Sequence, residues 1–107
     1  MIEPLEVYLL QVQDKNPTRA AQALASLALF SDVRALTAIQ TAFFHPNQKV
    51  RAAAAQAAGI NLDSSLFEAL LSLQDDPEPE VRLAAVLAMG KYANKGHQEQ
   101  VVLELLK

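Results

Sequence analysis

Few residues of this sequence could do chemistry, and none stands at a spacing that catalysis or metal binding requires. The two histidines, His45 and His97, are far apart, and neither has a second ligand three or four positions away. A zinc site needs such clustered ligands. We therefore interpret both histidines as solvated or capping residues. The sequence has no cysteine, so thiolate nucleophiles, thiolate metal ligands and disulfides are excluded.

Carboxylates and serines offer two further candidates for chemistry. Four acids flank two prolines: Asp75, Asp76, Glu78 and Glu80 surround Pro77 and Pro79. Paired carboxylates can transfer protons, but a stretch of this kind is typical of an exposed turn whose charge favours the start of a helix. We interpret Ser64 and Ser65 as a helix cap and not as nucleophiles, since no histidine lies near them in the sequence to act as a base. The sequence thus predicts a protein that is not an enzyme and has no cofactor and no metal.

Composition limits the remaining classes of function. The 107 residues suit one domain; 51% are apolar but only 6% aromatic, which indicates thin layers of small residues between closely packed helices. The net charge of −3, without a basic stripe, argues against nucleic-acid binding. No apolar run approaches the ~20 residues of a membrane helix, and the N-terminus lacks the basic segment of a signal peptide. We expect a cytoplasmic protein, which the absence of cysteine fits.

A repeat organises the chain. Residues 45–54 (HPNQKVRAAA) and 76–85 (DPEPEVRLAA) share a proline, a Val-Arg pair and a run of small residues at the same offsets. In both copies, the arginine (Arg51 or Arg82) is followed eight positions later by a glycine, Gly59 or Gly90. A fainter copy begins at residue 16 (NPTRAA), and aligning its Arg19 with Arg51 gives a step one position longer than that from Arg51 to Arg82. Steps of this length fall within the periods of roughly 20–50 residues that indicate stacked repeats.

Two kinds of helix alternate within each copy. Outer helices are predicted where large apolar residues recur at helical spacing: Leu5, Tyr8, Leu9 and Val12; Leu36, Ile39 and Phe43; Leu66, Phe67, Leu70, Leu71 and Leu73; and Val102, Leu105 and Leu106. Inner, alanine-rich helices are expected at 17–29, 48–58 and 79–92. The expected boundary residues are Ser31 as an N-cap, Ser65 with Glu68 as a capping box, Pro17 and Pro77 in first turns, and Gly96 after the last inner helix.

The pattern Asp-Pro-x-x-x-Val-Arg-x-x-Ala followed by glycine resembles the HEAT-repeat family, most closely its short-period subgroup in phycobilin lyases and many bacterial scaffold proteins. Residues 46–59 and 77–90 match best, and 17–27 match weakly. The resemblance implies an all-α, right-handed α-solenoid of the armadillo type with about three and a half helix pairs. Within a single domain, 1–107, the repeats would be 3–29, 32–59, 63–92 and a half repeat 97–107. Stacking is also required physically, because one pair cannot bury its own apolar faces.

The resemblance further implies a ladder of ion pairs between repeats, formed by the arginine and the acid before the proline. Arg51, Asp76 and Arg82 are the residues that match this ladder. The acid is kept at Asp76, but His45 and Asn16 replace it in the first two copies. We expect Arg19, Arg51 and Arg82 to support the stack of repeats.

The inner helices suggest a binding surface. On a helical wheel, the last inner helix packs through Val81, Ala84, Ala85 and Ala88, with Leu83, Val86 and Gly90 opposite and Leu87 beside them. The corresponding residues are Ala52, Ala55, Gly59 and Gln56 in the second copy, and Ala20, Ala23 and Leu24 in the first. Either neighbouring helices cover these apolar columns, or the columns form a groove for a partner. The second interpretation places partner binding at Ala20, Leu24, Ala52, Gln56, Leu83, Val86 and Leu87.

Two functions from different classes remain. The first is a non-catalytic scaffold or adaptor that binds another protein or peptide on its concave face. The alternative is a lyase-type or chaperone-like subunit that holds a bilin chromophore or a phycobiliprotein, which would need a pocket lined by acids and aromatics. Most aromatics are expected in the core: Tyr8, Phe30, Phe43, Phe44, Phe67 and Tyr92. The last helix, with Val102, Leu105 and Leu106 and expected to run to Lys107, would either cap the stack or form a homodimer.

Overall fold

The computed structural model describes residues 3–106; Lys107 and the side chain of His97 lie outside the described part. Seven α-helices follow one another in this part: α1 (Pro4–Gln11), α2 (Pro17–Leu27), α3 (Val33–Ala42), α4 (Gln48–Asn61), α5 (Ser64–Leu71), α6 (Pro79–Tyr92) and α7 (Gln98–Leu105). A 3-10 turn, η1 (Ser72–Asp75), extends α5. The connection η2 (Ala93–His97) contains Gly96 at a φ of 120°, which separates α6 from α7. Residues 3–106 contain no strand, so the all-α prediction is confirmed.

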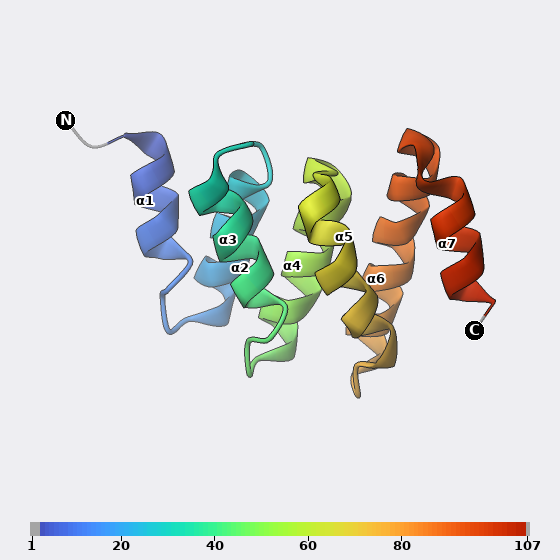
Figure 1. Cartoon of the computed structure of the whole chain (residues 1–107). Helices are drawn as coiled ribbons and strands as arrows, with labels where there is room; N and C mark the ends of the chain where they lie inside the picture. The colour runs from blue at the N-terminus through green and yellow to red at the C-terminus, as the bar shows by residue number, and fades with distance from the viewer. Residues whose placement is uncertain (1–2, 107) are drawn as a thin grey trace.

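The helices form two layers along one axis. In Figure 1 the outer helices α1, α3, α5 and α7 lie in one layer and the inner helices α2, α4 and α6 in the other. The central inner helix α4 packs against both α2 and α6. The molecule is elongated, 47 × 27 × 15 Å. This arrangement is the predicted α-solenoid of helix pairs.

Side-chain size differs between the two layers. The outer helices contribute large core residues such as Ile39, Leu66 and Leu70, all fully buried. The inner helices meet through alanine and glycine. A Cβ atom placed on Gly59 of α4 would lie 3.1 Å from the Cα and Cβ atoms of Ala88 in α6, so only glycine permits this approach without displacement of a neighbour.

Aspartates cap the outer helices α3 and α5, one or two positions away from the predicted caps. Asp32, not Ser31, caps α3 by accepting a hydrogen bond from the Arg34 N–H at 2.8 Å. Asp63 caps α5 and accepts from the Ser65 N–H at 2.9 Å, so the predicted capping box of Ser65 and Glu68 is wrong. A carboxylate is favoured here because it carries a charge that suits the helix N-terminus.

The inner helices begin at the predicted residues, 17, 48 and 79, but two of them end elsewhere and Pro77 does not stand in a first turn. Pro17 opens α2 as predicted. Pro79, not Pro77, is the first residue of α6, because the Asp76 carboxylate accepts the Glu78 N–H at 3.0 Å and holds the preceding segment in an extended turn. α2 ends at Leu27, two positions early, and α4 continues three positions further than predicted, to Asn61.

The structural repeat has the same length throughout. The N-cap residues of the inner helices are Asn16, Asn47 and Glu78, and the step from the first to the second equals the step from the second to the third. We call this step one repeat. The alignment of Arg19 with Arg51 is therefore wrong by one position. Arg19 lies on the surface, where its guanidinium is 3.7 Å from the Asp14 carboxylate.

Candidate functional site

The predicted ladder forms between the second and third repeats. Arg51 donates from Nε and Nη2 to the two carboxylate oxygens of Asp76, at 2.7 and 3.1 Å. Its Nη1 donates to the carbonyl oxygens of His45 and Pro46, at 2.8 and 3.1 Å. The Arg51 side chain is 14% exposed and that of Asp76 is 5% exposed. This bidentate pair, shielded from water, locks α4 to the turn before α6.

The ion pair changes the acidity of Asp76. Burial by itself would raise the pKa of the carboxyl. The hydrogen bonds from Arg51 and the Glu78 N–H, together with the positive charges of Arg51 and Arg82, outweigh burial and lower the pKa below its ordinary value of 3.8. Asp76 is therefore a carboxylate at neutral pH, as the ladder requires.

The turn before each inner helix has a side-chain acceptor at the same place. Asp14, His45 and Asp76 occupy equivalent positions in successive repeats, and each accepts the N–H two positions further on, at 2.7, 3.0 and 3.0 Å. The prediction that Asn16 replaces the acid is therefore wrong, because Asp14 occupies that position. His45 is correctly identified as the replacement, and its Nδ1 is the acceptor. His45 thus serves the turn, as the interpretation of it as a capping residue expects.

Three residues of the predicted partner surface are inaccessible. Ala20 and Leu24 are fully buried and Ala52 is 8% exposed, which corrects their assignment to an open groove. The inner helices α2 and α4 are flanked by further helices, so residues on the side opposite the outer layer can still be covered. Ala20 and Ala52 are small, which lets a neighbouring helix lie close to them.

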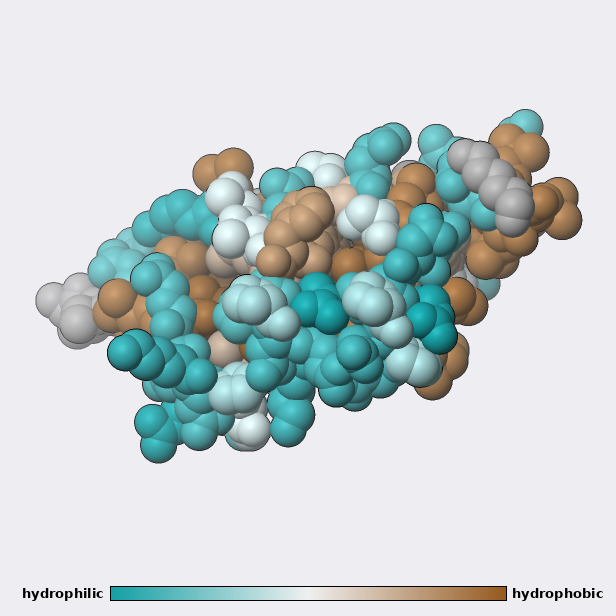
Figure 2. All heavy atoms as spheres, turned by 90° about the horizontal axis from the view of Figure 1, so that it is seen from below, coloured by the Kyte–Doolittle hydropathy of each residue, from teal (hydrophilic) through white to brown (hydrophobic). Residues whose placement is uncertain are grey.

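The last inner helix differs from the first two. Leu83, Val86 and Leu87 of α6 are 60%, 44% and 62% exposed. We call the surface formed by Leu83, Val86 and Gly90 the end face. In Figure 2 the hydrophobic colour gathers at the end of the molecule that carries the C-terminus. Contiguous exposed apolar surface of this kind marks interaction sites.

Helix α7 adds to this apolar end. α5 buries Leu66, Phe67 and Leu70, a spacing that recurs in α7 as Val101, Val102 and Leu105. Only Val101 is buried in α7, whereas Val102 and Leu105 are 54% and 52% exposed. The end face of α6 and the apolar side of α7 are therefore both exposed.

A shallow groove lies between α4 and α6, beside the end face. Its volume is about 320 Å³, and we call it the inner groove; Gln56, Gly59, Ile60, Ala84, Leu87, Ala88 and Lys91 line it. Gln56 and Leu87, two predicted site residues, thus share one surface. The sequence analysis did not include the groove residues Ile60 and Lys91 among the site residues. Both could have been found from the repeat, because they stand one and two repeats after Leu29, which is also exposed.

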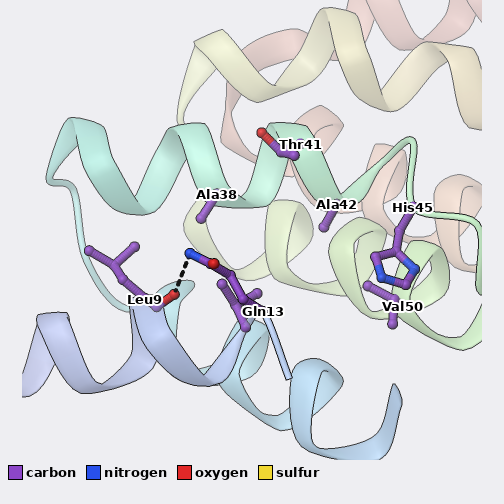
Figure 3. Close-up of a pocket in the computed structure, with 8 residues that line it drawn as sticks. Leu9, Gln13, Ala38, Thr41, Ala42, His45 and Val50 are labelled. Carbon is purple, nitrogen blue, oxygen red and sulfur yellow. Dashed lines mark hydrogen bonds between the residues drawn. The ribbon is translucent and has the colours of Figure 1, made fainter. Parts of the chain in front are cut away.

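A cavity lies between α1 and α3. Its volume is about 470 Å³, and Figure 3 shows Leu9, Gln13, Ala38, Thr41, Ala42, His45 and Val50 around it, with Val12 completing the lining. The Gln13 amide donates to the Leu9 carbonyl at 3.4 Å across one side. The lining contains neither the acids nor the aromatics expected of a bilin pocket.

The described residues contain no cluster of three or more histidine, aspartate or glutamate side chains that could hold a metal ion. None of the helices described is both long and apolar enough to cross a bilayer.

Comparison with known proteins agrees with this architecture. A search of curated proteins finds no match to the chain. A family model described as HEAT repeats matches twice, over residues 2–90 and 43–107. The two matches overlap and together cover nearly the whole chain, as expected of a repeated unit. With its stacked helix pairs and the Arg51–Asp76 pair between repeats, the chain belongs to the HEAT-repeat family.

Proposed function

We propose that the chain is a non-catalytic scaffold that binds another protein through the exposed apolar residues of α6. HEAT repeats generally mediate protein–protein interaction. The observation that carries the proposal is the exposure of Leu83, Val86 and Leu87 on a single helix. Burial of each side chain would contribute about 1.5–3 kcal/mol if it were complete, so a partner that covers all three would gain substantial affinity.

A comparison of variants tests this function. Leu83→Asp and Leu87→Asp place a charge on exposed positions, so the melting temperature should stay close to that of the wild type. Capture of the partner from an extract of the source organism should fall more than tenfold, because truncation of an interface anchor commonly costs more than about 1 kcal/mol. Leu10→Asp on α1, where Leu10 is 70% exposed, is the matched control and should leave capture unchanged.

Two results would count against the proposal. Unfolding of Leu83→Asp and Leu87→Asp would show that both leucines belong to the core. An unchanged fold with unchanged capture would move the site elsewhere, for example to the acidic turn at residues 75–80.

The alternative, a lyase-type subunit for a bilin or a phycobiliprotein, has two features in its favour: the sequence resemblance and a shallow pocket of about 440 Å³ whose lining includes Phe43, Phe44, Asp75 and Asp76. The aromatic rings pair inside the fold, Tyr8 with Phe30 at 6.1 Å and Phe67 with Tyr92 at 5.2 Å between centroids. Phe44, 71% exposed, is the aromatic left most open to solvent. We expect no change in the absorption spectrum of a bilin when the protein is added; a red shift with saturation would favour the alternative.

A further inference from the structure

The end face of α6 has a counterpart that is buried. One repeat before Leu83, Val86 and Gly90 stand Ala52, Ala55 and Gly59 of α4. Those three residues of α4 are buried, and at Gly59 the helix that covers them is α6. The end face is therefore the surface on which, one repeat earlier, another inner helix lies.

Arg82 supports the same interpretation. The Nη1 atoms of Arg51 and Arg82 donate to the carbonyl oxygens of His45 and Asp76, both at 2.8 Å, and these two carbonyls are themselves one repeat apart. Arg51 uses its Nε and Nη2 for the carboxylate before the next inner helix. No carboxylate in residues 3–106 forms an ion pair with Arg82, which is exposed.

Helix α7 provides the second wall of this surface. In the third pair, α6 covers the apolar residues of α5, as the contact between the rings of Phe67 and Tyr92 illustrates. Val102 and Leu105 of α7, which have the same spacing as Phe67 and Leu70, are about half exposed. Because α7 packs against α6, a helix placed on the end face would lie beside these two residues.

We propose that the end face and α7 receive one α-helix of a partner protein, preceded by an aspartate or glutamate that pairs with Arg82. The helix lies along α6 in the register in which α6 lies along α4. Leu83 and Val86 are larger than the alanines they correspond to, so small and medium apolar residues of the partner fill the contact. This inference rests on the proposed function and specifies the partner's chemistry.

A second copy of this chain fits the surface less well than a partner helix. In α2, the counterparts of Val81, Ala84 and Ala88, two repeats earlier, are Arg19, Gln22 and Ser26. These side chains are polar, and Arg19 and Gln22 are exposed. The first inner helix therefore presents a polar face, not the apolar one that the end face requires.

A peptide titration tests the inference. The probe is a synthetic peptide of residues 75–92, which contains α6 and its acidic turn, added to the full-length chain labelled with ¹⁵N. Because α6 occupies the corresponding surface of α4, the peptide should cause saturable amide shifts at Leu83, Val86, Gly90 and Val102. An Asp76→Asn peptide should bind about tenfold more weakly to the wild-type chain, since hydrogen bonds to charged groups contribute about 1.5–3 kcal/mol. When the chain carries Arg82→Gln, the Asp76→Asn peptide and the original peptide should bind equally well, because the carboxylate then has no arginine to pair with.

A variant with a bulky side chain on the end face shows whether weak binding of the peptide occurs at that face. Nothing lies within 4 Å of a Cβ atom placed on Gly90, so Gly90→Trp should fold normally and reduce peptide binding more than tenfold. Binding that Gly90→Trp leaves unchanged, shifts confined to the inner groove, or no binding at 1 mM peptide would each overturn the inference. So would a dimer of the chain alone that Leu83→Asp converts to monomer, because a second copy would then occupy the face. If Leu83→Asp abolishes capture of the natural partner while the peptide fails to bind, the proposed function stands and only the helix inference fails.

Discussion

At the scale of single residues, one position closes the same turn in each repeat and has a second task in only one of them. Asp14, His45 and Asp76 all accept a backbone N–H two positions ahead, so each closes the turn before an inner helix. Only Asp76 also pairs with an arginine of the preceding repeat. The imidazole of His45 can close the turn but cannot supply a negative charge, and Ala20 occupies the position of Arg51 in the first repeat. The ladder therefore has a single complete rung in the described part of the chain.

The rung makes stability dependent on pH. The pKa of Asp76 is lower in the folded protein than in the unfolded chain. Its contribution to the unfolding free energy is therefore fully present above the unfolded value of about 3.9 and is lost as pH falls through the folded pKa. Urea titrations at pH 7, 5, 4 and 3 should show stability falling most steeply below about pH 4.

The variant Asp76→Asn isolates this contribution. The amide oxygen can still accept the Glu78 N–H, but the charge that faces Arg51 is lost, so we expect destabilisation of about 2 kcal/mol at pH 7. The decline toward pH 3 should become shallower, with a remainder from Asp32 and Asp63, whose pKa values hydrogen bonds from Arg34 and Ser65 also lower. An equally steep decline in the variant would show that the rung does not control acid stability.

The two glycines of the repeat predict opposite outcomes for the same substitution. Gly90→Ala adds a methyl group where nothing lies within 4 Å, so the higher helix propensity of alanine should stabilise the protein by about 0.5–1 kcal/mol. Gly59→Ala brings the methyl group 3.1 Å from Ala88, and the strain should cancel or reverse that gain. Thermal melting of both variants provides the comparison; equal stabilisation would mean that α4 and α6 separate without cost.

At the scale of helices, the inner helices α4 and α6 are held at both ends. The Arg51–Asp76 pair holds the N-terminal turns. At the other end, Asn61, the last residue of α4, donates to the carbonyls of Ala28 and Phe30 at 3.0 and 2.8 Å. Tyr92, the last residue of α6 and the counterpart of Asn61 one repeat later, donates its hydroxyl to the Asp63 carbonyl at 2.6 Å. α4 and α6 are thus each attached to the connection that precedes the outer helix of the same pair.

The hydroxyl of Tyr92 tests this attachment. Tyr92→Phe keeps the ring contact with Phe67 and removes the hydrogen bond to Asp63, so a loss of about 1 kcal/mol in unfolding free energy is expected. Tyr8→Phe is the control, because its ring packs against Phe30 and no hydrogen bond of its hydroxyl is present in the described residues. Chemical denaturation of both variants measures the difference, and equal losses would contradict the role given to the hydroxyl.

Sequence patterns predicted the helices better than their surroundings. Periodic leucines and alanine runs identified every helix of the described chain, because burial imposes that periodicity. The exposed face was harder to predict: a wheel shows which side of a helix is apolar but not how many neighbours it has. Ala52 and Leu83 occupy corresponding positions, yet a helix covers only the first. The open end face thus depends on the order of the helices along the stack.

At the scale of the whole molecule, stability is distributed unevenly along the axis. The main contacts of each helix are with its own pair and the adjacent pairs, and in such arrays local stability is the sum of repeat and interface terms. α4 lies in the middle and buries seven residues, whereas the end helices α1 and α7 each bury one of their described residues, Leu5 and Val101. Both ends of the stack are therefore less stabilised than its middle, and one of these ends carries the proposed binding surface.

Hydrogen exchange should reveal this gradient. The amides of α4 should exchange slowest, near the global unfolding free energy, and those of the end helices α1 and α7 fastest. If a partner helix docks on the end face, the protection of α7 should rise most on binding. Uniform exchange rates from α2 to α7 would contradict the gradient and indicate a single cooperative unit.

The close approach at Gly59 also determines the shape of a longer array. Alanine and glycine bring the inner helices together, while leucine and phenylalanine keep the outer helices apart, so each pair is a wedge with its thin edge on the inner side. A row of such wedges curves toward its thin edge, so the inner helices lie on the concave side. Residue volume at a few inner positions therefore controls the radius of curvature, and the larger Leu83 and Val86 would make the bend flatter at a fourth helix pair than within the first three.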